Sequence, residues 1–531
     1  MKEEHRDRII NEVEQRILTQ YLAHPQMSEQ VLFDTIFHER QRLETEKNKD
    51  LIRSQAEYYD KLYKKSLLAS PKQQKVLLKE ITGRFANEVL GNFDPHVYTL
   101  STKVIPPALG LLLNTLSPLR LWETMTGSGK LVDQLIISGA TAQLTALSKL
   151  GTIVLVPTHL SNLDSILIGY GLHHIGLPPF TYGAGLNLFS NRLISFFMKN
   201  LGAYRVDRKK KAPLYKDVLK TYASCTLEMG YHNLFFPGGT RSRSGKIETK
   251  LKLGLLGMAL NAYINNLMNK KEKPSIYVVP CTLNYQLVLE AETLIDDFLK
   301  ETGKEQYIIE DDEFSQPKRI LEFIKKIFTL HSRIHLVIGE PLDVFGNQID
   351  DQGHSMDLRG RKINPELYVT SDGQPMIDEL RDREYTKQLA SAISLSYHKN
   401  TVLNSTNLVS YSIFQMLKEA NPDLDLYRLL RTGGRQESFA MTHFYQRLQQ
   451  TLALVEKWEK KGLVIRDAPL KKGDPISICN EALAHLNGYH RYPTLIRKGD
   501  RLFHHHRNLL LYYQNRVDSI RQSHISEAIF H

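Results

Sequence analysis

A histidine and an aspartate five residues apart follow an apolar segment in the first third of the chain. His159 comes shortly after the run Thr152–Val156, and Asp164 ends the sequence HLSNLD. A histidine at the end of a buried strand lies at the carboxyl edge of the sheet, where a carboxylate one turn into the next helix can accept its Nδ1–H and leave Nε2 free as a base. The spacing therefore predicts a general base with its orienting acid and no protein nucleophile. A histidine that only caps the helix of Asp164 is the alternative.

A glycine-rich turn with two arginines follows a second apolar segment, Tyr231–Phe236. Gly238 and Gly239 allow close approach of the backbone, and Arg241 and Arg243 carry planar, permanently charged groups suited to bidentate phosphate contact. Further positive charge comes from Lys246, Lys250 and Lys252. The turn predicts an anion site, and a basic surface loop is the alternative.

The order of these motifs resembles that of the glycerol-phosphate acyltransferases. Four blocks occur in sequence: HLSNLD at 159–164, GAYRVDR at 202–208, FPGGTRSRSG at 236–245 and VPCTLNY at 279–285. The likeness is closest to the glycerol-3-phosphate 1-O-acyltransferase branch, because AGLNL at 184–188, KLG at 252–254 and GEPL at 339–342 also suit it. Weaker likeness reaches residues 385–409 and 510–516, so it covers about residues 80–531.

The resemblance implies transfer of a fatty acyl group from acyl-CoA or acyl-carrier protein to the sn-1 hydroxyl of glycerol 3-phosphate, the first step of glycerophospholipid synthesis. It implies no cofactor and no metal ion. His159 would take the hydroxyl proton while Asp164 holds its tautomer. The phosphate would be bound by Arg208, Arg241, Arg243 and Lys252, and the backbone at Gly238 and Gly239 would be a candidate for stabilising the oxyanion.

Two alternatives to this function stay open. Within the enzyme class, 1-acylglycerol 3-phosphate or dihydroxyacetone phosphate could be the acceptor, because each offers one hydroxyl and one phosphate. In another class, the chain would be a non-catalytic basic protein that binds anions or nucleic acid. It carries no recognised nucleic-acid-binding motif, and we expect no nucleic-acid partner.

Position 238 departs from the family pattern. The third block usually carries Glu between the Pro and the first Gly, where this chain has Gly238. If that carboxylate orients the acceptor or braces the loop in relatives, water or another acid must take its place here.

Short apolar segments alternate with helical stretches between residues 96 and 345. The segments 152–156, 231–236, 276–282 and 334–338 predict buried strands, and their alternation with helices predicts an α/β acyltransferase domain with a mostly parallel sheet. Helical regions are expected on both sides, at 1–95 and at 381–531. Residues 346–380 are rich in Gly, Asp and Pro and predict a linker or a surface excursion.

Composition and charge bear on location. The 531 residues are 42% hydrophobic and carry a formal net charge of +11, which excludes a disordered or collagen-like chain and favours anionic partners. The acidic start predicts no signal peptide, and the apolar segment 104–116 is too short and too interrupted by proline to span a membrane. We expect a peripheral or monotopic protein on a cytoplasmic membrane face, with segments 104–116 and 193–198 at the lipid interface. A soluble protein that uses carrier-protein donors is the alternative.

Overall fold

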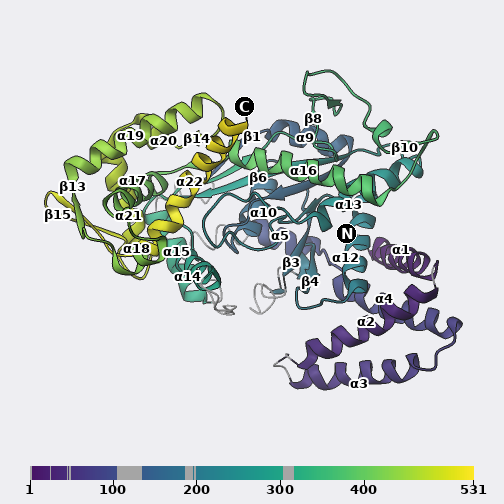
Figure 1. Cartoon of the computed structure of the whole chain (residues 1–531). Coiled ribbons are helices and arrows are strands. Elements are labelled where there is room, and N and C mark those ends of the chain that lie inside the picture. The colour runs from purple at the N-terminus through teal and green to yellow at the C-terminus, as the bar shows by residue number, and fades with distance from the viewer. Residues whose placement is uncertain are drawn as a thin grey trace.

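The computed structural model describes residues 3–23, 25–44, 46, 49–103, 134–185, 195–196, 199–302 and 316–530. A seven-stranded sheet with the order β1-β7-β6-β2-β5-β3-β4 forms its centre (Figure 1). Its strands are β1 (Leu135–Gly139), β2 (Thr152–Pro157), β3 (Thr181–Gly185), β4 (Ala203–Val206), β5 (Asn233–Leu234), β6 (Ile276–Tyr285) and β7 (Ile334–Ile338). Neighbouring strands are parallel except β6 and β7. The expected α/β class with a mostly parallel sheet is confirmed.

Three of the expected strands, at 152–156, 276–282 and 334–338, coincide with β2, β6 and β7, whose residues are all buried. The segment 231–236 forms only the two-residue β5, after which the chain turns at Pro237. Strands β1, β3 and β4 lie outside the expected segments. They are short and partly exposed, so they carry no continuous apolar run.

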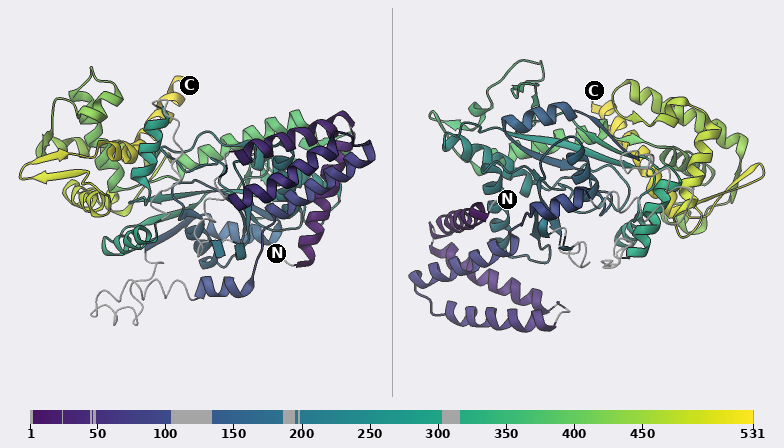
Figure 2. Two further views of the ribbon diagram at one scale, coloured as in Figure 1. Left: turned by 90° about the horizontal axis from the view of Figure 1, so that it is seen from below. Right: turned by 180° about the vertical axis from the view of Figure 1, so that it is seen from behind.

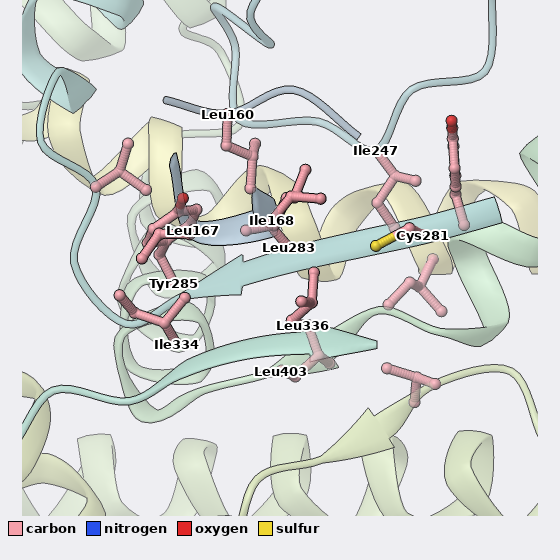
Figure 3. Close-up of a cluster of buried hydrophobic side chains, with 14 of the residues drawn as sticks. Leu160, Leu167, Ile168, Ile247, Cys281, Leu283, Tyr285, Ile334, Leu336 and Leu403 are labelled. Carbon is pink, nitrogen blue, oxygen red and sulfur yellow. The ribbon is translucent and has the colours of Figure 1, made fainter. Parts of the chain in front are cut away.

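Helices cover the sheet on both faces and position the loops at its carboxyl edge. They are α9 (Thr141–Leu150), α10 (Asp164–His174), α12 (Pro213–Glu228), α13 (Leu253–Met268), α14 (Ala291–Thr302), α15 (Pro317–Thr329) and α16 (Glu379–Lys399). In Figure 3, Leu167 and Ile168 of α10 lie beside Leu283 of β6 and Leu336 of β7. Leu403 joins the same apolar core, so the C-terminal part of the chain is packed into the domain that carries the sheet.

The N-terminal region is helical, as expected, with α1 (Glu3–Leu22), α2 (Pro25–Glu44), α3 (Lys49–Ser66), α4 (Pro71–Val89) and α5 (Pro95–Lys103). The stretch 30–68, which lacks Gly and Pro, holds parts of two helices, α2 and α3. Helices α1, α2 and α4 pack against α12 around an apolar core of their own. The views in Figure 2 agree that these helices and the C-terminal part lie at opposite ends of the sheet.

The C-terminal part holds α17 (Ser405–Ala420), α18 (Leu426–Thr432), α19 (Met441–Lys460), α20 (Ala468–Lys472), α21 (Pro475–Gly488) and α22 (Arg507–Phe530). Small sheets that the sequence did not predict accompany these helices, with the strands β12 (Val402–Leu403), β13 (Ser438–Ala440), β14 (Ile465–Arg466), β15 (Leu495–Lys498) and β16 (Arg501–His504). Helix α22 packs along α17 and α14. It therefore returns the end of the chain to the central domain.

Residues 346–380 form short surface elements. They contain two strand pairs, β8 (Gln348–Ile349) with β9 (Ser355–Met356) and β10 (Thr370–Ser371) with β11 (Gln374–Pro375), and the 3₁₀ helix η4 (Pro365–Val369). Among the described residues, no helix is both long and apolar enough to cross a membrane. The apolar segment 104–116 and most of 193–198 lie outside the described residues.

Candidate active site

The loop between β2 and α10 brings His159 and Asp164 together. His159 Nδ1 lies 2.9 Å from Asp164 Oδ2, and the Asp164 side chain is fully buried. The same oxygen accepts the backbone N–H groups of Leu160 at 2.6 Å and Ser161 at 2.9 Å, while Tyr285 Oη donates to Oδ1 at 2.5 Å. These donors fix the carboxylate, which in turn orients the imidazole with Nε2 available as a base.

The His159 ring is held in a form suited to a base. Burial lowers its pKa below the ordinary value, Asp164 acts in the opposite direction, and the positive charges of Arg241 and Arg208 lower it further. The imidazole is therefore neutral at neutral pH. Phe236 stacks on the ring with centroids 4.1 Å apart and an interplanar angle of 22°, which holds its orientation.

The third block folds over the base. The backbone N–H of Ser242 donates to the carbonyl oxygen of His159 at 2.7 Å. Gly239 has φ +78° and Gly245 has φ +74°, and a Cβ at position 245 would collide with the Tyr512 carbonyl, so both positions favour glycine. The Gly239 N–H donates to the Phe236 carbonyl at 3.0 Å, so an oxyanion would have to displace this bond to use it.

Glu290 ties the first block to the third. Its carboxylate is fully buried and accepts Ser161 Oγ–H at 2.7 Å and the Asn162 N–H at 3.0 Å. It also pairs with the Arg241 guanidinium at 3.3 Å. Glu290 therefore fixes Arg241 beside the loop of His159.

Arg208 approaches the same place from the loop after β4. Burial lowers the pKa of Arg208, and the positive charge of Arg241 lowers it further. Both guanidinium groups also depress the pKa of His159. Two like charges thus lie within electrostatic reach of each other and of the base, an arrangement that an anion would stabilise.

Arg243 and Lys252, the other two residues expected to bind the phosphate, have surroundings unlike those of Arg208 and Arg241. Arg243 pairs with Asp297 Oδ2 at 3.1 Å and with Glu301 Oε2 at 2.6 Å, both on α14. Lys252 is exposed, and its side chain passes over Gly239. A phosphate would have to compete with two carboxylates for Arg243, and the role of both side chains stays a prediction.

Two further charged groups from distant segments reach the site. Glu248 Oε1 accepts the backbone N–H of His159 at 2.8 Å. Arg516 of α22 is buried, donates to the Leu283 carbonyl at 3.3 Å, and interacts electrostatically with Glu248 and Asp164. Sequence reasoning assigned no role to Tyr285, Glu248, Glu290 or Arg516, although Tyr285 ends the fourth block and the weaker likeness at 510–516 includes Arg516.

The described residues contain no cluster of three or more His, Cys, Asp or Glu side chains arranged to hold a metal ion. The cysteines Cys225, Cys281 and Cys479 are free and buried.

Comparison with protein families defines the class of this site. Residues 141–284 match the family model described as Acyltransferase. The matched segment contains His159, Asp164, Arg208 and Arg241. This segment of the chain is therefore similar to that acyltransferase family.

Curated relatives narrow the resemblance to glycerol-3-phosphate acyltransferases. The protein of that name from Aeromonas hydrophila subsp. hydrophila is 32% identical over 227 residues, which cover 42% of this chain and 26% of the relative. Those from Pseudomonas syringae pv. tomato and Haemophilus influenzae are 25% and 26% identical over 279 and 269 residues, or 52% and 50% of this chain. The matches span only 30% and 29% of these two relatives.

Proposed function

We propose that this chain transfers an acyl group from an acyl thioester to the sn-1 hydroxyl of glycerol 3-phosphate. The observation that carries the proposal is the buried Asp164–His159 pair with Arg208 and Arg241 beside it. An acceptor that carries a hydroxyl and a phosphate on one small molecule needs a base for the hydroxyl and a cationic site for the phosphate, a short distance apart. The names of the curated relatives support this acceptor.

In the proposed mechanism His159 Nε2 removes the proton from the acceptor hydroxyl as its oxygen attacks the thioester carbonyl. The positive charge formed on the imidazole is stabilised by the buried Asp164 carboxylate. The tetrahedral intermediate then collapses, the carbon–sulfur bond breaks, and the leaving thiolate takes the proton from His159. No acyl-enzyme is needed, because the thioester is already activated.

Arg208 and Arg241 would bind the acceptor phosphate. Charge-assisted hydrogen bonds to phosphate are stronger than neutral ones, and guanidinium groups form them in pairs. Glu290 pairs with Arg241 at 3.3 Å and fixes its guanidinium beside the loop of His159. Arg243 and Lys252 are proposed as outer contributors to the same positive field.

The donor would be acyl-CoA or acyl-carrier protein, and the place of action would be an anionic membrane surface on the cytoplasmic side. The net charge of +11 supports attraction to such a surface. Ile166 of α10, two residues after Asp164, is 50% exposed, and Phe196, in the segment expected at the interface, is 46% exposed. Vesicle flotation tests this part: binding should strengthen with anionic lipid and weaken at high salt, and no flotation with any lipid would contradict it.

An acceptor panel tests the activity itself. The purified chain is assayed with palmitoyl-CoA and, separately, glycerol 3-phosphate, dihydroxyacetone phosphate and 1-acylglycerol 3-phosphate. The highest kcat/KM is expected with glycerol 3-phosphate, with the acyl group at the sn-1 position of the product. A preference for either other acceptor would replace the proposed substrate, and no transfer to any of them, with palmitoyl-CoA or palmitoyl-carrier protein, would contradict the proposed function.

A further inference from the structure

Glu248 contacts both the loop that carries the base and the glycine-rich turn. Oε1 of its carboxylate accepts the His159 N–H at 2.8 Å. The other oxygen, Oε2, is shielded from solvent, and the described residues offer it no hydrogen-bond partner. This oxygen lies 2.4 Å from the position that a Cβ atom on residue 238 would occupy.

The backbone at Gly238 does not itself require glycine. Its φ is outside the positive range found at Gly239 and Gly245. A Cβ atom at this position would instead require the Glu248 carboxyl group to move, because two side-chain atoms do not lie 2.4 Å apart without displacement. The absence of a side chain at Gly238 therefore leaves room for the carboxyl group of Glu248.

The surroundings of Glu248 act on its ionisation in opposite directions. The Arg516 guanidinium offsets its charge, and the His159 N–H favours the same ionised form. The loss of water on burial is the larger effect and, together with the negative charge of Asp164, raises the pKa of Glu248 to about 8, so the group is mostly protonated at neutral pH. The carboxyl group thus belongs to the same buried electrostatic cluster as the base and its orienting acid.

We propose that Glu248 is a positioning residue for the base His159, and that residue 238 is glycine because Glu248 fills the space beside it. A side chain at position 238 would displace the Glu248 carboxyl group from the His159 N–H. This inference rests on the proposed role of His159 in acyl transfer. It assigns Glu248 no contact with the substrate.

Removing the carboxylate should affect turnover more than acceptor binding. Glu248→Ala leaves the His159 N–H without its acceptor, and kcat should fall roughly 5- to 150-fold, as expected when a buried donor loses its partner. The KM for glycerol 3-phosphate should stay nearly unchanged, because the arginines are not touched. Glu248→Gln keeps an oxygen for the N–H and should restore most of kcat. Equal losses in the Ala and Gln variants would overturn the role in positioning.

A double-mutant cycle tests the match between the two residues. Gly238→Ala should lower kcat by displacing the carboxylate, but it should add little in the Glu248→Ala background, where the space is free. Gly254→Ala is the matched control, because its Cβ would meet only a lysine carbon at 4.0 Å. Fold-losses that multiply in the double variant would contradict the proposal.

Thermal unfolding of the same four proteins separates this inference from the proposed function. The changes in Tm caused by Gly238→Ala and by Glu248→Ala should be non-additive in the double variant, whether or not the chain transfers acyl groups. Absence of transfer by the unchanged protein would contradict the proposed function alone. Additive Tm changes would overturn the match between Gly238 and Glu248, whether or not transfer is observed.

Discussion

Lys210 connects the N-terminal helices to the loop that carries Arg208. Its ammonium group is 2.5 Å from Glu88 Oε2 of α4 and 3.4 Å from Glu39 Oε2 of α2, and it lies 4.3 Å from the centroid of the Phe85 ring. The Lys210 side chain is 5% exposed and that of Glu39 is fully buried. The ion pair is therefore poorly screened by water.

Lys210→Ala should destabilise the chain substantially. Removing one partner of a buried ion pair costs about 3–5 kcal/mol, because the other charge stays buried. The value here should lie at the lower end, about 3 kcal/mol, since Arg42 still pairs with Glu39 at 2.9 Å and Glu88 is partly exposed. For a cooperative unit of 150–250 residues, a loss of 1 kcal/mol lowers Tm by about 2–4 °C, so a decrease of about 6–12 °C is expected.

The assay for Lys210→Ala combines thermal unfolding with steady-state kinetics. Because Arg208 lies two residues away, loosening this loop should raise the KM for glycerol 3-phosphate more than that for the acyl donor. Lys211→Ala is the matched control, since it removes the same charge from an exposed neighbouring position. Equal Tm values for the two variants would show that the buried ion pair does not hold the loop.

Further predictions concern the site. Asp164→Asn should lower kcat strongly because the amide can stabilise the wrong tautomer of His159, which rate measurements at saturating substrate would detect. Arg241→Ala should raise the KM for glycerol 3-phosphate roughly 10- to 150-fold, more than that for the donor; an effect on the donor alone would move this arginine to the thioester's own phosphates. Because the folded-state pKa of Glu248 is about 8, against an ordinary value of 4.5, the folded chain holds a proton there that the unfolded chain has lost. The contribution of Glu248 to the free energy of unfolding should therefore decrease as pH rises from about 4.5 to 8. Urea unfolding of Glu248→Gln at several pH values should lack this part of the pH dependence. Because the pKa of His159 is lowered, kcat/KM should begin to fall only below pH 6.5, the ordinary histidine value.

The parts of the fold that the sequence predicts are those with strong local signals. Strands β2, β6 and β7 are fully buried and appear as continuous apolar runs. Strand β3 contains two glycines and is only partly buried, so it lacks such a signal. Its place in the sheet depends on pairing with β4 and β5, which local patterns do not report.

The same distinction holds at the site. His159 and Asp164 are five residues apart on one strand–loop–helix unit, so their contact could be expected from spacing. Glu248 meets His159 from 89 residues away, and Glu290 meets Ser161 from 129 residues away. Their contacts depend on tertiary packing, and no motif marks either residue. The ion pairs of Arg243 with α14 are unpredictable for the same reason.

Acyl transfer by the purified chain and by its His159→Ala variant tests the role of His159 as the base. Transfer from labelled palmitoyl-CoA to glycerol 3-phosphate is measured for both proteins after circular dichroism confirms that each is folded. His174→Ala, an exposed histidine on α10, is the matched control. If His159 is the base, the rate should be about 10²- to 10⁴-fold lower for His159→Ala and unchanged for His174→Ala. Near-normal transfer by folded His159→Ala protein would contradict this role.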